Sequence, residues 1–249
     1  MTTNKSPRHG VARVISKLGL CSRTQAADWV RAGRVRVNGA QVSDPEHPVR
    51  QGVDKVSVDG MERERSADRL TIMLNKPRGL ITTTNDEQGR ETVYRCFEGA
   101  GLPWLAPAGR LDKASEGLLL FSNDPEWNAA VTGAQRGPRK TYHVQINRVP
   151  DEAMLNALIQ GVRVDDEFLR ATDARVLRQG GKNAWLVIEL DEGRNRQIRR
   201  LLSALDVRVL RLIRVAIGAL QLGDLPKGQW RALNAADLQA LNLPASETG

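Results

Sequence analysis

The segment GRLDKASEGLLLFSND, residues 109–124, combines a charged turn with an apolar run. It places one carboxylate, Asp112, between Arg110 and Lys113, and the run LLLF follows at 118–121. A short apolar run of this kind predicts a buried strand. The acid therefore stands where the chain enters its own core. Two interpretations fit this pattern: a salt-bridged turn, or a catalytic carboxylate.

The composition predicts a soluble globular protein with a basic surface. The chain has 249 residues, of which 41% are hydrophobic and 27% are charged, enough for one large domain or two smaller ones. Its 37 Lys and Arg outnumber 29 Asp and Glu, and residues 1–50 alone hold nine basic and three acidic residues. Such asymmetry favours a nucleic-acid partner, with a merely solvated basic surface as the alternative.

The cysteines and histidines predict neither a metal site nor a disulfide framework. Cys21 and Cys96 have no metal-ligand spacing, and His9, His47 and His143 lie far apart. We expect reduced thiols in a cytoplasmic protein. The polar start of the chain does not resemble a secretory signal, and no apolar run approaches the roughly 18 residues that a membrane span requires.

Residues 9–59 predict a small basic domain, after a tail at 1–8 and before a charged linker at 60–69. Ser22 followed by Gln25 is a capping-box pattern, so a helix should begin near Arg23 and end near Gly33. A helix is also predicted over 11–19, with Val14, Ile15 and Leu18 facing inward. Residues 34–37 alternate arginine and valine before Asn38-Gly39, which predicts a hairpin.

Residues 70–245 predict a second, larger domain of the α+β class. Strands are expected on both sides of a break at 75–79, and again at 118–121, 140–147, 171–178, 183–190 and 207–213. Helices are expected at 125–134, 151–160, 194–205 and 235–241. Because several strands follow one another without intervening helices, the sheet should be mostly antiparallel.

The segment 194–205 predicts an amphipathic helix with a basic border. Its buried stripe consists of apolar side chains at helical spacing, namely Ile198, Leu201, Leu202 and Leu205. Arg199 lies about 100° from Ile198 and so at the edge of this stripe, whereas Arg196 and Arg200 should point outward, toward phosphate. A border arginine favours a carboxylate partner, and Asp112 is the candidate. The alternative is a basic helix with a chance arginine at its edge.

Four ordered motifs resemble those of pseudouridine synthases, and in particular the RsuA/RluB/RluE/RluF branch that modifies ribosomal RNA. They are LNKPRG at 74–79, GRLDKASEGLLLFSND, KTYHV at 140–144 and EGRNRQIRRLL at 192–202, with a similar closing pattern at 212–233. Residues 13–39 resemble the S-four-type RNA-binding module. Thr24 departs from that module's second arginine, and Pro125 stands where the synthases have glycine.

The resemblance implies a fold and a reaction. It implies a helix–helix–hairpin S-four-type domain followed by a catalytic domain with a mostly antiparallel, bent sheet flanked by helices. The reaction converts a uridine of ribosomal RNA to pseudouridine on a flipped-out nucleotide, without a cofactor or a metal. We expect a monomer, because no coiled coil is visible.

The resemblance also implies roles for single residues. Asp112 would be the catalytic carboxylate, Arg199 its partner, and Tyr142 the ring that stacks on uracil and a candidate proton acceptor. Arg110 would fill the space that the nucleotide leaves. The RNA contacts would be Arg23, Arg31, Arg34, Arg36, Lys76, Arg78, Arg194, Arg196 and Arg200, with a structural role as the alternative for Lys76.

Several alternatives stay open from sequence. The carboxylate could attack the anomeric carbon, attack carbon 6 of uracil, or remove a sugar proton. A non-catalytic ribosome assembly factor, an RNA nucleosidase and a synthase for transfer RNA are the rival functions. The target uridine, and whether the substrate is free RNA or an assembled subunit, are not encoded in any motif.

Overall fold

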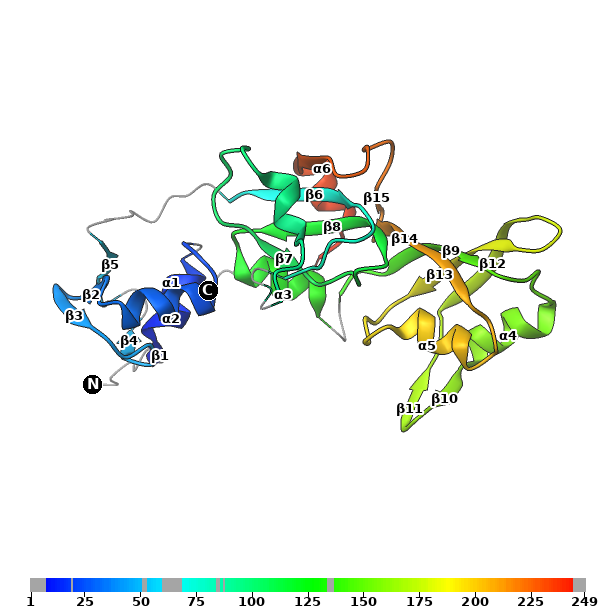
Figure 1. The fold of residues 1–249 in the computed structure, drawn as a ribbon, viewed down its shortest axis with the longest axis horizontal. Coiled ribbons are helices and arrows are strands. Elements are labelled where there is room, and N and C mark those ends of the chain that lie inside the picture. Colours follow the sequence, from blue (N-terminus) through cyan, green and yellow to red (C-terminus); the bar gives the residue numbers. More distant parts are fainter. Residues whose placement is uncertain are drawn as a thin grey trace. The chain divides into compact units, whose positions relative to one another are not determined.

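The structure is a computed structural model that describes residues 8–18, 20–50, 53–59, 69–83, 86, 88–133 and 137–243 (Figure 1). The chain divides into two compact units whose main boundary falls between Thr71 and Ile72. The predicted linker lies outside the described residues except for Arg69. The predicted tail also lies outside them except for Arg8, which begins a strand.

The first unit contains two helices and two small antiparallel sheets. Its elements are β1 (Arg8–Gly10), α1 (Val11–Lys17), α2 (Arg23–Arg31), β2 (Val35–Val37), β3 (Ala40–Val42), β4 (Pro48–Arg50) and β5 (Val56–Val58). The strands pair in the order β3-β2-β5, and β1 pairs with β4. Apolar residues from both helices and from β2, β3, β4 and β5 form one core cluster.

The predicted start of α2 at Ser22 and the predicted hairpin are confirmed. The Ser22 hydroxyl accepts a hydrogen bond of 3.1 Å from the Gln25 N–H, at the start of α2. Asn38 and Gly39 both have positive φ, as a tight hairpin turn between β2 and β3 requires. The inward prediction for Leu18 is wrong, because α1 ends at Lys17 and the Leu18 side chain is 42% exposed.

The second unit is built on one large sheet. Its strands are β6 (Thr71–Lys76), β7 (Ala106–Ala108), β8 (Glu116–Ser122), β9 (Lys140–Ile146), β12 (Asp173–Gln179), β13 (Ala184–Leu190), β14 (Val209–Ile217), β15 (Leu220–Gln221) and β16 (Trp230–Ala232). They run in the order β12-β13-β9-β14-β8-β6-β16, with β15 on β14 and β7 on β8. The pairs β12–β13, β13–β9, β9–β14, β14–β15 and β6–β16 are antiparallel, and β14–β8 is parallel. The predicted α+β class with a mostly antiparallel sheet is therefore confirmed.

Helices and a small hairpin accompany this sheet. They are η1 (Val93–Phe97), α3 (Pro125–Thr132), α4 (Glu152–Gln160), α5 (Gln197–Ser203), α6 (Ala235–Ala240), and the hairpin of β10 (Val162–Val164) with β11 (Glu167–Leu169). The second strand predicted after residues 75–79 is wrong: in the described part of that segment Ile81 makes a single bridge to Thr92. The helix predicted over 194–205 begins only at Gln197 and ends at Ser203, and Leu205 beyond it is half-buried.

Strand β8 carries the opening segment into the centre of the sheet. All seven of its residues are buried, which explains an apolar run without alternation. Gly117 has a φ of +100°, and a Cβ there would lie 2.2 Å from the backbone oxygen of Arg214 on β14. Glycine is therefore required where the two strands approach. This close pairing fixes the turn that precedes β8 and carries Asp112.

Candidate active site

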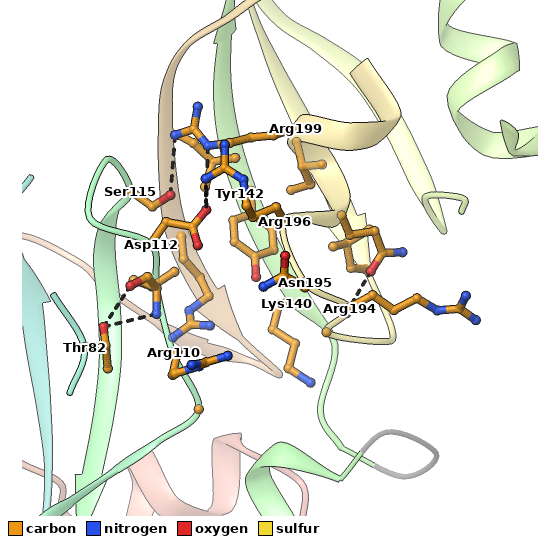
Figure 2. A pocket seen from close by; sticks show the side chains of 18 of the residues that line it. Thr82, Arg110, Asp112, Ser115, Lys140, Tyr142, Arg194, Asn195, Arg196 and Arg199 are labelled. Carbon is orange, nitrogen blue, oxygen red and sulfur yellow. Dashed lines mark hydrogen bonds and ion pairs between the residues drawn. The ribbon is translucent and has the colours of Figure 1, made fainter. Parts of the chain in front are cut away.

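A cleft of about 470 Å³ lies in the second unit, and all three predicted catalytic residues line it (Figure 2). Asp112 comes from the turn before β8, Tyr142 from β9, and Arg199 from α5. These segments are remote in sequence and meet because β9 and β14 bring the two halves of the sheet together.

The backbone around Asp112 is held by a buried lysine. The Lys76 side chain is fully buried, and its Nζ donates hydrogen bonds to the carbonyl oxygens of Pro77 at 3.1 Å, Asp112 at 3.2 Å and Ser115 at 2.9 Å. Burial lowers the pKa of Lys76 to about 8, and the Asp112 charge opposes this shift. The predicted RNA contact of Lys76 is therefore wrong, and its structural alternative holds.

A second contact fixes the same turn from the other side. The Thr82 hydroxyl donates to the Leu111 carbonyl oxygen at 2.8 Å and accepts from the Leu111 N–H at 3.3 Å. Leu111 and Ser115, on either side of Asp112, are both buried. The backbone of the turn is thus immobilised, while the Asp112 side chain keeps an exposed fraction of 33% on the cleft side.

Two arginines approach one oxygen of Asp112. The Arg196 Nη1 donates a hydrogen bond of 3.0 Å to Asp112 Oδ2, and the Arg199 Nε lies 3.8 Å from the same oxygen. Arg199 also donates through Nη2 to the Ala114 carbonyl oxygen at 3.3 Å and to the Ser115 hydroxyl at 3.5 Å. Arg199 therefore forms the predicted ion pair, but Arg196 makes the hydrogen bond.

The outward prediction for Arg196 is wrong for a geometric reason. Arg196 precedes the first residue of α5 and has a φ of +50°, so the 100° helical step does not apply to it. Its guanidinium reaches Asp112, although the Arg196 side chain is 50% exposed (Figure 2). Burial lowers the pKa of Arg199, as do the nearby charges of Arg196 and Arg78, whereas Asp112 raises it.

Tyr142 lies on the face of β9 that lines the cleft. Alternate residues of β9 are buried, and Tyr142 is one of them with an exposed fraction of 9%. Tyr142 lines the same cleft as Asp112 and Arg196 (Figure 2). An aromatic ring next to the carboxylate offers a flat apolar surface on which a base can stack.

The predicted RNA contacts of this unit fall into two groups. Arg110 and Arg194 line the cleft, and Arg110 is exposed. Arg78 is also exposed, and its charge lowers the pKa of Arg199. Arg194 also donates to Glu192 Oε2 at 2.9 Å. Arg200 does not line the cleft, because it forms ion pairs with Glu167 and Asp165 near the β10–β11 hairpin.

The four arginines predicted in the first unit are each engaged locally. Arg23 pairs with Glu46 at 3.0 Å and Arg31 with Asp28 at 3.2 Å. Arg34 pairs with Asp59 and lies over the Trp29 ring, 5.3 Å from its centroid, and the Arg36 Nη1 donates to the Gly39 carbonyl oxygen at 3.4 Å. Exposed ion pairs of this kind are weak, so the arginines that form them can exchange their carboxylate partners for an RNA phosphate. The RNA contacts of the four arginines stay a prediction.

Two buried cations of the cleft were missed from sequence. Lys140 on β9 and Arg214 on β14 line the cleft with exposed fractions of 8% and 5%. Lys140 stands two residues before Tyr142, so strand alternation places both on one face and could have indicated it. No sequence pattern indicated that Arg214 lines the cleft, because an arginine inside a predicted strand normally points to solvent.

The described residues contain no cluster of His, Cys, Asp or Glu that could hold a metal ion. None of their helices is long and apolar enough to cross a membrane. The cleft thus offers one carboxylate, one aromatic ring and several cations. That set suits a reaction on an anionic polymer in which a carboxylate acts beside a stacked base.

Comparison with known proteins gives the family. Residues 70–204 match the RNA pseudouridylate synthase family, and residues 11–54 match the S4 domain. An uncharacterized RNA pseudouridine synthase of Aquifex aeolicus is 34% identical over 93% of this chain and 92% of its own length. Ribosomal large subunit pseudouridine synthase B of Bacillus subtilis is 32% identical over 92% of this chain and 93% of its own.

A crystal structure of a pseudouridylate synthase agrees at the level of the fold. It has a TM-score of 0.63 at 29% identity, and the match covers 95% of this chain and 100% of the other. The fold is thus an S4 domain joined to a pseudouridine synthase domain. The chain belongs to the RNA pseudouridylate synthase family, and it is an RNA-modifying isomerase.

Proposed function

We propose that this enzyme converts a uridine of ribosomal RNA to pseudouridine, with Asp112 as its catalytic carboxylate and without a cofactor. The observation that carries the proposal is the arrangement of Asp112: an immobilised backbone, an exposed carboxylate, and two arginines on one oxygen. The ribosomal substrate is supported by two relatives, from Bacillus subtilis and Haemophilus influenzae, both called ribosomal large subunit pseudouridine synthase B.

The chemistry requires little more than the cleft supplies. Uridine and pseudouridine have the same formula, so the reaction has no net redox change and needs no energy source. The base must reach Asp112, so the nucleotide has to leave its helix, which costs a few kcal/mol. In this proposal Tyr142 is the stacking surface for the flipped base, and Arg110, which is exposed and lines the cleft, fills the space that the nucleotide vacates.

The Asp112 carboxylate is aimed before the RNA arrives. Lys76 and Thr82 hold the main chain of its turn, and Arg199 is anchored to the same turn through Ala114. Such preorganisation lowers the barrier because no reorganisation is needed in the transition state. The proposal leaves all three roles of the carboxylate open, since each requires only that Asp112 lie beside the flipped nucleotide.

In this proposal the first unit binds RNA and the second unit carries out the reaction. Residues 9–59 bind structured RNA through exposed arginines, which fix orientation more than they read bases. Residues 60–69 connect this domain to the catalytic domain at 70–245. We place the enzyme in the cytoplasm as a monomer acting on ribosomal RNA, either free or within an assembling subunit.

The test is Asp112→Asn, assayed on transcribed large-subunit and small-subunit ribosomal RNA and on transfer RNA. Pseudouridine is detected by mass-shift labelling, and RNA affinity is measured separately. We expect the wild type to form pseudouridine at one ribosomal position, and the variant to form none while binding RNA within a few fold. Turnover by Asp112→Asn would refute the assignment of the carboxylate. Modification of transfer RNA alone would refute the substrate, and released free uracil would identify a nucleosidase.

A further inference from the structure

Two buried positive charges in the cleft form no ion pair with any residue that the structure describes. The Lys140 side chain makes no hydrogen bond or ion pair to any described residue, although Lys140 has an exposed fraction of only 8%. Arg214 donates through Nε to the Leu118 carbonyl oxygen at 2.7 Å. Its Nη2 is buried and has no hydrogen-bond partner in the part of the chain that the structure describes.

The sheet register brings these two groups to the face that carries Tyr142. Strand β9 pairs with β14 so that Tyr142 lies opposite Arg214 and Lys140 opposite Ile217. Lys140 and Tyr142 are two residues apart on one strand and share a face. The Arg214 charge adds to burial in lowering the pKa of Lys140, while Asp191 opposes it. The two cations therefore repel each other inside the wall of the cleft.

A buried, unpaired charge is costly, and a stable fold keeps one where a ligand will neutralise it. Asp112 is already paired with Arg196 and Arg199, so it does not neutralise Lys140 or Arg214. In Figure 2 the Tyr142 side chain lies between those of Asp112 and Lys140. A base stacked on Tyr142, with its sugar at Asp112, would therefore direct its far edge toward Lys140.

The reaction itself generates the missing negative charge. When the bond between C1′ and N1 breaks, its electron pair stays on the uracil, whose charge spreads over N1 and both carbonyl oxygens. C5 then bonds to C1′, the proton on C5 is lost, and N1 gains a proton, so the formula is unchanged. Between these two bond changes the base is an anion, which fixed positive groups stabilise strongly in a dry site.

We propose that Lys140 and Arg214 form a cationic wall that receives the uracil beside Tyr142 and stabilises its negative charge while it is detached from the ribose. This inference rests on the proposed function and extends it from the carboxylate to the base. The competing ligand for these two groups is an RNA phosphate. Exposed arginines such as Arg110 and Arg78 are better placed for phosphate, because a phosphate on the RNA backbone stays near the surface.

The test compares uridine with 5-fluorouridine at the modified position of one ribosomal RNA fragment. Fluorine makes the departing base less basic, so the anion needs less help from the protein. Single-turnover rates at saturating RNA are measured for Lys140→Met as disappearance of the intact nucleoside. Lys182→Met, an exposed lysine of the β12–β13 turn, is the matched control.

We expect Lys140→Met to slow the reaction of uridine by about 100-fold or more, the effect of one lost charge-stabilising donor. The loss with 5-fluorouridine should be at least about ten-fold smaller, because the better leaving group compensates for the missing charge. RNA affinity should match that of Lys182→Met, and the melting temperature should be no lower than that of this control, because Lys140→Met removes a buried charge. For Arg214, the variant Arg214→Lys keeps a charge within the buried site and should lose less than Arg214→Met.

Other outcomes overturn the proposal. Equal losses on both substrates would show that Lys140 does not act on the charge of the base. Weaker RNA binding with a salt dependence reduced by about one ion would instead assign Lys140 to a phosphate. Unchanged reaction rates for Lys140→Met would show that Lys140 has no role in the reaction. If the wild type forms no pseudouridine at all, the proposed function fails, which the wild-type reaction alone decides.

Discussion

Replacing Lys76 with methionine should disable the site without touching the substrate. Methionine has nearly the length of the buried lysine stem but no donor. Three carbonyl oxygens, those of Pro77, Asp112 and Ser115, then lose the ammonium that they share at 2.9 to 3.2 Å. The Asp112 turn loses the contact that ties it to the end of β6.

The magnitude follows from two opposing terms. Hydrogen bonds to a charged group contribute roughly 1.5 to 3 kcal/mol each, so three of them give about 6 kcal/mol. Burying the charge costs about 3 kcal/mol at neutral pH, because the pKa of Lys76 falls from 10.5 to about 8. We therefore expect Lys76→Met to lower the free energy of unfolding by about 3 kcal/mol. A turn that relaxes by about 1 Å would also slow catalysis by about 100-fold.

The pH dependence gives this prediction a second signature. A lysine with a lowered pKa binds fewer protons when folded than when unfolded, so its contribution to stability increases with pH between about 8 and 10.5. From pH 8 to pH 9.5 the wild type should gain on the order of 1.5 kcal/mol relative to Lys76→Met. Urea unfolding at several pH values measures this, with Lys182→Met as control. A constant difference between the two proteins across that range would contradict a buried, charged Lys76.

Two further predictions concern the charges around the same turn. Arg196→Met should reduce the salt dependence of RNA binding by about one ion. It should slow the reaction at saturating RNA far less than Arg199→Met does, because Arg199 also holds the Ala114 carbonyl. Equal rate losses for the two variants in single-turnover assays would contradict this. Glu116→Gln should destabilise the protein by about 2 kcal/mol at pH 7, because Arg211 and Lys227 lower the pKa of Glu116 to about 2. That difference should be complete above pH 4.5 and vanish as the pH falls toward 2, as acid-unfolding curves of both proteins would show.

The sequence predicted the parts of the fold that depend on periodicity and local caps. Alternation at residues 34–37 predicted β2, and the apolar run predicted β8, because burial on one or both faces of a sheet leaves its mark on neighbouring residues. Ser22 predicted the start of α2 because its hydroxyl satisfies a backbone donor within the same turn. These signals are local, so one chain suffices to read them.

The sequence failed where a residue's role depends on tertiary contacts or on an exact helix boundary. Arg196 and Arg200 were both expected to face phosphate. Arg196 reaches Asp112 because α5 begins only at Gln197, after Arg196. Arg200 is held by Glu167 near a hairpin that the pattern did not predict. Lys76 was expected to contact RNA, since nothing local shows that three carbonyl groups from two segments converge on its ammonium.

The two interpretations of the opening segment are compatible because the turn is stabilised mainly through its backbone. Lys76 and Thr82 bind main-chain atoms of the turn, and Arg199 binds the Ala114 carbonyl, so three fixed contacts leave the Asp112 side chain available. Among the residues that the structure describes, only Arg196, whose side chain is half exposed, donates a hydrogen bond to that carboxylate. An arginine held by one exposed bond can move to an RNA phosphate at little cost, whereas Arg199 cannot leave without breaking its contact to the turn. The geometry thus separates the group that aims the carboxylate from the group that the substrate can displace.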